Sequence, residues 1–139
     1  MERVGLIFLD RPALAQQVQL AQYAEKRGFE SVWVCETRLV RDAVTPLAAF
    51  AMATDRIKLA TGVVNNWTRS VGLMAMTLAT LHELSQGRVI LGIGAYWDPL
   101  AWNQGIRRRK TLTAMREYVT VVRRLLNLET EPTKGRWCR

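Results

Sequence analysis

Residues 57–62 read IKLATG, a short apolar run that ends in a glycine. A run of this length and character is typical of a buried β-strand. Similar runs occur before and after it, so that the expected strands begin near residues 3, 30, 57 and 88. A spacing of about 30 residues is the length of one strand followed by one helix. The sequence therefore predicts a strand–helix unit that is repeated along the whole chain.

Helix signals separate the expected strands. Asp10 and Pro12 are predicted to open the first helix, and Gly28 to end it. Thr45 is the predicted N-cap of the second helix, and Gly87 ends the third. The apolar stripes predicted for the two longest later helices are Met74, Leu78, Leu81 and Leu84, and then Met115, Val119, Val122 and Leu126.

The near-continuous apolar strands indicate a parallel sheet that is covered on both faces. Two architectures fit this pattern: an open doubly wound sheet of flavodoxin or receiver type, and half of a (β/α)8 barrel. No Gly-x-Gly-x-x-Gly motif or phosphate loop follows the first expected strand, which disfavours a Rossmann domain. A receiver domain requires a phospho-acceptor Asp after the third strand, where this chain has Thr61 and Gly62. That alternative therefore fails.

In both architectures ligands bind at the carboxyl ends of the strands, so the residues that follow each strand are the candidate site. Glu36 follows the second strand and is the candidate general acid or base, with a loop salt bridge to an arginine as an equal alternative. Gly62 suits the close approach of a flat ring because it has no side chain. Asn65 either offers a polar group to a ligand or caps an ordinary turn. Gly94 and Ala95 precede aromatic residues and are suited to a slot for a planar ligand.

The composition fits one packed α/β domain, since 49% of the 139 residues are hydrophobic and 23% are charged. The sequence shows neither a signal peptide nor an apolar run long enough to span a membrane, so we expect a cytoplasmic protein. The formal net charge is +8, but the cations are spread along the chain except at residues 107–110. We interpret that run as a solvated basic face rather than as an anion or partner site, and we expect no nucleic-acid partner. Cys35 is interpreted as a buried small hydrophobe, and His82 lacks neighbours at ligand spacing, so no metal is expected.

Several segments resemble the luciferase-like monooxygenase superfamily. Residues 24–33, AEKRGFESVW, match the family run A-E-x-x-G-F-x-S-x-W. Residues 61–69 are similar to the third strand of the family and its following loop, and residues 79–88 and 91–94 are similar to the next helix and strand. The similarity is strongest to members that use coenzyme F420, such as methylenetetrahydromethanopterin reductase-like proteins.

This resemblance implies an α/β fold made of the first four strand–helix units of a TIM (β/α)8 barrel, with residues 1–139 as its truncated N-terminal half. It implies a flavin- or F420-dependent oxidoreductase that performs hydride transfer or monooxygenation, with coenzyme F420 or FMN as cofactor. The pair Gly62–Val63 matches the position of a non-prolyl cis peptide in the family. The expected cofactor-binding residues are Gly62, Val63, Asn65, Gly94 and Ala95.

Two positions depart from the family pattern. Many deazaflavin members place a pair such as Asp-His after the second strand, where this chain has Glu36 and Thr37. Several members place an acid directly after the small-residue turn of the fourth strand, where this chain has Tyr96 and Trp97 before Asp98. The resemblance therefore does not assign a substrate or a proton donor to this chain.

The partners follow from the same resemblance and from the length of the chain. We expect a small-molecule substrate, no membrane partner, and a homodimer at full length. Because strands five to eight of the barrel are not in the sequence, we expect the fragment to be inactive or barely active alone. The alternative function is a non-catalytic half-barrel, a binding or assembly module that dimerises through exposed strand edges.

Overall fold

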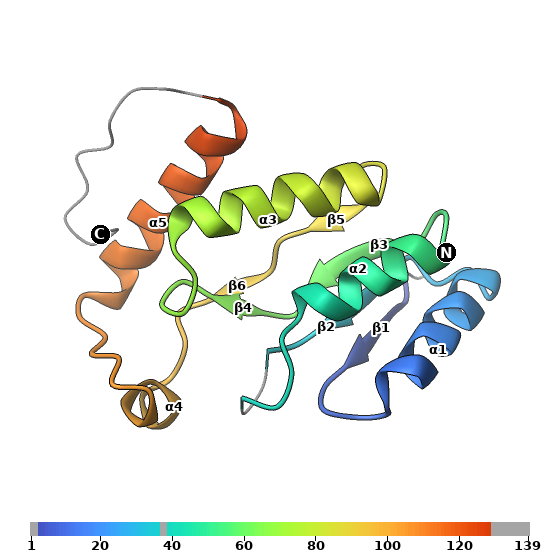
Figure 1. The fold of residues 1–139 in the computed structure, drawn as a ribbon, viewed down its shortest axis with the longest axis horizontal. Coiled ribbons are helices and arrows are strands. Elements are labelled where there is room, and N and C mark those ends of the chain that lie inside the picture. Colours follow the sequence, from blue (N-terminus) through green and yellow to red (C-terminus); the bar gives the residue numbers. More distant parts are fainter. Residues whose placement is uncertain (1–2, 37–38, 129–139) are drawn as a thin grey trace. The chain divides into compact units, whose positions relative to one another are not determined.

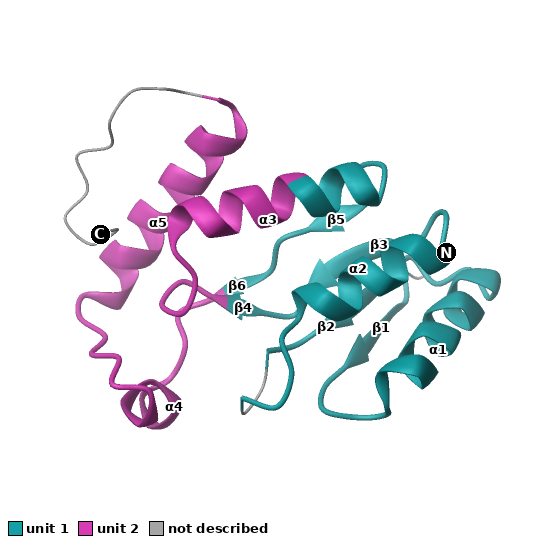
Figure 2. Ribbon diagram, viewed as in Figure 1, with its two compact units in different colours: residues 1–64, 80–93 teal, residues 65–79, 94–139 magenta. Residues whose placement is uncertain are grey.

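The computed structural model describes residues 3–36 and 39–128. The chain divides into two compact units, shown in Figure 2: unit 1 is residues 1–64 with 80–93, and unit 2 is residues 65–79 with 94–139. No helix within the described ranges is long and apolar enough to cross a membrane. The elements in chain order are β1 (Gly5–Phe8), α1 (Leu14–Lys26), β2 (Ser31–Val34), α2 (Val44–Ala53), β3 (Lys58–Thr61), β4 (Val64–Asn65), α3 (Val71–Leu84), β5 (Val89–Ile90), β6 (Ile93–Gly94), α4 (Asp98–Asn103) and α5 (Thr111–Leu126).

Unit 1 is built on a parallel sheet with the strand order β1-β2-β3-β5 (Figure 1). The register pairs Leu6 with Val32, Val32 with Leu59, and Leu59 with Val89. Each strand of this sheet therefore lies beside the strand that precedes it in the sheet order and in the sequence. This sequential parallel order confirms the predicted α/β class, and it is the order of a (β/α)8 barrel rather than of a doubly wound sheet.

The sheet has one face in the core of unit 1. Phe8, Val32 and Val34 are buried on that face, and the ring of Phe8 packs against Phe50 of α2 with 5.7 Å between the ring centroids. Helix α1 contacts β1 and α2, while α2 contacts β3. Side chains alternate between the two faces of a strand. Ile7 belongs to the opposite face and is 56% exposed, so that face is open at β1, whereas Ala60 of β3 is fully buried on the same face.

The predicted fourth strand, residues 88–93, is wrong in its extent. It is divided into β5 and β6, and β6 pairs with β4, a short strand that the sequence did not indicate. The physical reason lies at Gly92, whose N–H and carbonyl are both hydrogen-bonded to the hydroxyl of Thr61. The Gly92 carbonyl also accepts a hydrogen bond from the backbone N–H of Val64 at 3.1 Å, so the chain passes here from pairing with β3 to pairing with β4.

The predicted helix ends are confirmed, because Gly28 and Gly87 have φ angles of 79° and 86°. Glycine adopts such left-handed angles without steric cost. The predicted start of α1 is wrong: the helix begins at Leu14, and Pro12 lies before it, after a cis bond to Arg11. The carbonyl of Pro12 accepts a hydrogen bond from Gln17, so Pro12 supports the first turn from outside.

The predicted N-cap of α2 is also wrong. The helix begins at Val44, one residue before Thr45. A carboxylate oxygen of Asp42 accepts hydrogen bonds from the backbone N–H groups of Val44 and Thr45, at 2.9 and 2.8 Å. Asp42 therefore performs the capping that the sequence pattern assigned to Thr45.

The long helices bury their predicted faces to different degrees. In α3 the stripe is confirmed at Met74, Leu78 and Leu81, which are buried, and is wrong at Leu84, which is 38% exposed. In α5 the predicted stripe is confirmed at Val122 and is wrong at Leu126, which is 42% exposed; the buried residues of this helix are Ala114, Tyr118, Val121 and Val122. The hydroxyl of Tyr118 donates to the carbonyl of Arg69 at 2.9 Å, which sets the rotation of α5 in unit 2.

Candidate functional site

Glu36 and Val63 follow β2 and β3 and lie side by side in unit 1. The backbone N–H of Glu36 donates to the carbonyl of Val63 at 3.2 Å. One carboxylate oxygen of Glu36 accepts from the N–H of Ala43 at 3.5 Å. The strand ends thus bring the candidate catalytic residue next to a candidate cofactor-binding residue, and the role of Glu36 as an acid or base stays a prediction.

Gly62 and Val63 directly follow the end of β3. The N–H of Gly62 donates to the carbonyl of Val34 at 2.7 Å, and the bond between Gly62 and Val63 is cis, as the resemblance implies. The side chain of Val63 is 43% exposed, directly beyond a strand whose last three residues are buried. This strand end therefore presents an open apolar surface.

Cys35 lies against the same strand end. Its side chain is buried, which confirms the prediction, and its thiol donates to the carbonyl of Gly62. Burial, followed by the Asp10 carboxylate, raises the pKa of the Cys35 thiol. A raised pKa keeps the sulfur protonated near neutral pH, so Cys35 is a packing residue rather than a nucleophile.

Thr61 and Gly92 join β3 to the segment between β5 and β6. The hydroxyl of Thr61 donates to the carbonyl of Gly92 at 2.7 Å and accepts from its N–H at 2.8 Å. A Cβ atom on residue 92 would lie 2.0 Å from the carbonyl oxygen of Thr61. Only glycine allows this approach, which the sequence alone did not reveal.

Asn65 caps a turn in unit 2. Its side-chain oxygen accepts hydrogen bonds from the N–H groups of Trp67 and Thr68, at 2.9 and 3.0 Å. This is the turn-capping role that the sequence offered as the alternative. A contact of Asn65 with a cofactor stays a prediction. The side-chain oxygen of Asn65 is already occupied by the two hydrogen bonds of the turn.

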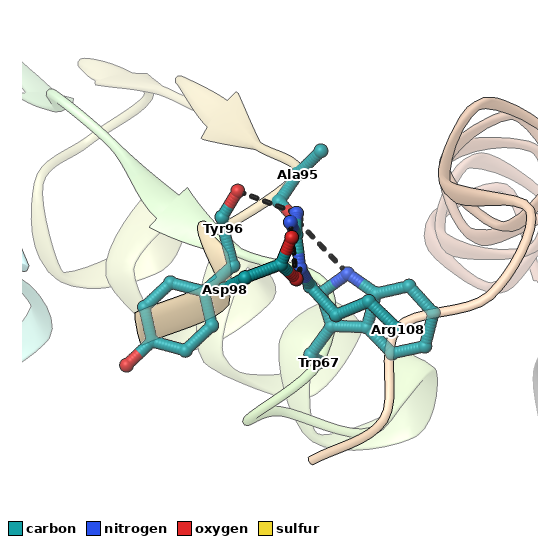
Figure 3. A network of polar contacts seen from close by, with 5 residues as sticks. All are labelled: Trp67, Ala95, Tyr96, Asp98 and Arg108. Carbon is teal, nitrogen blue, oxygen red and sulfur yellow. Dashed lines mark hydrogen bonds and ion pairs between the residues drawn. The ribbon is translucent and has the colours of Figure 1, made fainter. Parts of the chain in front are cut away.

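Gly94 and Ala95 lead into a turn that is fixed by the network in Figure 3. The carbonyl of Ala95 accepts from the indole N–H of Trp67 at 3.0 Å and from Arg108 at 2.8 Å. Arg108 also donates to the carbonyl of Tyr96 at 2.7 Å and to Asp98 at 2.6 and 2.8 Å. Tyr96 has a φ angle of 62°, an unusual value for a residue with a side chain. The network holds the backbone of the turn in this conformation.

The interpretation of residues 107–110 as a solvated basic face is wrong for Arg108. Its side chain is only 12% exposed and is paired with Asp98, while the other three residues of the run are exposed. A guanidinium group has several donors in a fixed plane, so it can bind a carboxylate and two carbonyl groups at once. The sequence did not indicate which arginine of the run has this role.

Asn66 is a further residue that the sequence analysis did not select. It is 9% exposed, and its side-chain oxygen has no hydrogen-bond partner in the described part of the chain. Its neighbours on both sides, Asn65 and Trp67, are held by the bonds given above. No residue type or spacing distinguishes a buried, unpaired amide from an ordinary loop asparagine.

Comparison with known proteins identifies one family. The pattern of the family described as luciferase-like monooxygenase matches residues 3–137. The chain is 34% identical over 122 residues to 5,10-methylenetetrahydromethanopterin reductase of Methanolobus tindarius, covering 88% of this chain and 37% of that protein. It is 33% identical over 131 residues to limonene 1,2-monooxygenase of Rhodococcus erythropolis, covering 90% of this chain and 34% of the relative.

A solved structure extends the similarity to the fold. The coenzyme F420-dependent tetrahydromethanopterin reductase of Methanopyrus kandleri superposes with a TM-score of 0.79 at 26% identity, covering 88% of this chain and 39% of that one. The chain therefore spans between a third and two fifths of the length of these proteins. The match over part of the neighbour's length, together with the sequential sheet, confirms the predicted partial barrel.

Proposed function

Because the chain belongs to the luciferase-like monooxygenase family of enzymes, we propose that it carries the N-terminal part of a flavin- or deazaflavin-dependent oxidoreductase. The reaction is a hydride transfer or a monooxygenation on a small-molecule substrate. The observation that carries this proposal is the end of β3, where Gly62 and the exposed Val63 follow a buried strand next to Glu36. In parallel α/β folds the carboxyl ends of the strands bind the ligand.

The residues at this strand end fit a flat heterocyclic cofactor such as coenzyme F420 or FMN. Gly62 adds no side chain, and Val63 offers an apolar surface of the kind that binding pockets use against aromatic rings. The cofactor, when bound, supplies a ring position that accepts and returns hydride. Gly62 and Val63 of unit 1 are the residues proposed to contact the ring. For Asn65, Gly94 and Ala95 the cofactor-binding role stays a prediction from the family resemblance.

Glu36 is proposed as the general acid or base. Its backbone is tied to Val63, so its carboxylate is held at the same strand end as the proposed ring contact. A carboxylate can hold a proton on one oxygen and exchange it with a substrate group within hydrogen-bond distance. Where a hydride transfer is accompanied by the gain or loss of a proton, such a side chain donates or accepts it.

Two variants of the 139-residue chain test the proposed cofactor contact. We expect FMN or coenzyme F420 to bind in a saturable manner, and Val63→Asp to weaken that binding by about tenfold or more, since about 1.4 kcal/mol is a factor of ten. The control is Val40→Asp, which places the same charge at another exposed valine of unit 1. Fluorescence titration measures both, and equal affinities for the two variants would refute the contact.

A second candidate function is favoured by the edges of the sheet in unit 1. β1 and β5 are its first and last strands, and Ile7 of β1 is exposed on the face opposite the core. Strand edges and apolar faces pair readily with a further chain. We therefore propose as the alternative an assembly module that forms a homodimer. Sedimentation without cofactor tests it: a stable dimer that binds neither cofactor favours assembly, and a monomer excludes it.

A further inference from the structure

The end of β2 holds the Gly62–Val63 pair through three successive residues. The carbonyl of Val34 accepts a hydrogen bond from the N–H of Gly62 at 2.7 Å. The N–H of Glu36 donates to the carbonyl of Val63 at 3.2 Å. Between these two bonds along the chain, the thiol of Cys35 donates to the carbonyl of Gly62. All of these residues belong to unit 1, so the arrangement lies within one compact unit.

Cys35 supplies the only side chain that takes part in these three hydrogen bonds. The peptide unit between Gly62 and Val63 is planar, so a fixed carbonyl of Gly62 also fixes the direction of the Val63 N–H. Burial raises the pKa of the Cys35 thiol, which therefore stays protonated and keeps the hydrogen that it donates. The thiol thus holds this peptide unit in one orientation.

Trp33 packs beside the same peptide unit. A Cβ atom built on Gly62 would lie 3.4 Å from the Cβ of Trp33 and 3.5 Å from both its Cε3 and the Sγ of Cys35. The indole is itself held, because its N–H donates to the hydroxyl of Ser31 at 2.8 Å. Gly62 therefore has close neighbours on the side where a side chain would point, whereas Val63 is 43% exposed. Such a fixed backbone favours binding, since little entropy is lost when a ligand arrives.

We propose that Cys35 is a positioning residue for the cofactor contact: its thiol holds the Gly62–Val63 peptide in the orientation that a planar ring binds. This inference rests on the proposed function. Cys35 acts through the peptide and not on the ring, which distinguishes this role from that of a nucleophile or a redox group. Serine at this position would retain a donor of nearly the same size, whereas alanine would remove the donor.

Cofactor titration of three variants tests the proposal. FMN and coenzyme F420 are titrated by fluorescence against the wild-type chain, Cys35→Ala, Cys35→Ser and the control Ser85→Ala, at a temperature at which all four are folded. Ser85 is a fully buried residue of unit 1 whose hydroxyl accepts from the N–H of Arg88 at 3.2 Å, so the control removes a buried hydrogen bond elsewhere. We expect Cys35→Ala to weaken binding by about fivefold to tenfold, and Cys35→Ser and Ser85→Ala to stay within about twofold of the wild type.

A second readout needs no cofactor and no change at Cys35. In the variant Cys138→Ser the infrared S–H stretching band reports on Cys35 alone, and a hydrogen bond to a carbonyl lowers its frequency relative to a free thiol. We expect the lowered frequency. A band at the position of a free thiol would overturn the inference.

The titrations separate this inference from the proposed function. Equal losses of affinity in Cys35→Ala and Ser85→Ala would overturn the inference, because the effect would then be one of general stability. A loss in Cys35→Ser as large as in Cys35→Ala would also overturn it, since the donor would not be the cause. Wild-type binding that Cys35→Ala does not weaken refutes the inference alone. If the wild type binds neither cofactor, the proposed function fails and the inference with it.

Discussion

At the scale of single residues, one hydrogen atom in place of a methyl group decides how β3 meets the following strands. A Cβ on residue 92 would lie 2.0 Å from the carbonyl oxygen of Thr61, well inside contact distance. We predict that Gly92→Ala lowers the free energy of unfolding by about 2 kcal/mol or more, because backbone atoms would have to move. Urea unfolding of the purified variant measures this loss.

Gly72 in α3 provides the matched control for this substitution. Nothing lies within 4 Å of a Cβ built on it, and it is the second residue of α3. Alanine has a higher helix propensity than glycine, so Gly72→Ala is expected to leave stability unchanged or to raise it slightly. Equal effects of the two substitutions would show that the close approach at Gly92 does not exist.

Cys35 gives a prediction about pH. Burial and the Asp10 carboxylate raise its pKa, so the thiolate that reacts with alkylating reagents is scarcer at each pH than in an ordinary thiol. We predict that iodoacetamide modifies native Cys35 slowly at neutral pH and that the rate rises only above the pH range of a free cysteine. The measurement is made on the variant Cys138→Ser, in which Cys35 is the only remaining thiol. Rapid modification at pH 7 without unfolding would contradict the expected pKa shift.

The structural role of a residue could be predicted from the sequence only where its residue type, in that sequence context, has one common role. The burial of Cys35 and the helix-ending glycines belong to this class. The roles of Gly92 and Arg108 depend on which backbone oxygens come within reach after folding. Glycine and arginine each have several common uses, and spacing along the chain does not choose among them.

At the scale of elements, the residue that caps α2 differs from the residue that the sequence pattern predicted. Asp42 accepts two backbone hydrogen bonds at the start of the helix, whereas Thr45 lies inside it. We predict that Asp42→Ala lowers stability by about 1 kcal/mol and that Thr45→Ala has a smaller effect. Thermal unfolding of the two variants measures the difference, and a larger loss for Thr45→Ala would restore the original cap assignment.

Arg88 holds the connection between α2 and β3. It donates to the carbonyls of Ala51 and Thr54 at 2.9 Å and of Ile57 at 3.0 Å. Lysine keeps the charge but cannot supply this fork of donors. We predict that Arg88→Lys costs about 2 kcal/mol, as seen in the urea midpoint, while Arg107→Lys at an exposed position changes little. Similar midpoints for both would refute the role of Arg88.

The motif residues that carry the family resemblance also build the fold. Glu25, in the run of residues 24–33, accepts hydrogen bonds from the N–H groups of Arg56 and Ile57 at 2.6 and 2.8 Å. Together with Arg88 it fixes the turn that leads into β3. The sequence therefore predicted the order of strands and helices well, because repeated scaffold contacts leave a repeated pattern. The division of β5 from β6 and the rotation of α5 were missed, since each depends on the tertiary hydrogen bonds of one side-chain hydroxyl, that of Thr61 and that of Tyr118.

At the scale of the whole molecule, the formal charge of +8 is a poor guide to function. Arg88 and Arg108 are bound within the fold to backbone carbonyls, and Arg108 to Asp98 as well. Charge counts treat these side chains like solvent-exposed ones. The proposed function rests instead on the family resemblance and on the strand ends. The candidate site could be named because parallel strands share a carboxyl edge.

We propose that this chain, which spans 37% of the length of the methanopterin reductase relative, carries part of a cofactor site. The most direct measurement titrates the 139-residue chain and that full-length relative with coenzyme F420 and FMN and follows steady-state reduction. We predict saturable binding to the chain that is about a hundredfold weaker or more, equivalent to about 3 kcal/mol of lost contacts, and no turnover. Binding as tight as that of the relative with steady-state reduction, or no saturable binding at all, would contradict the account.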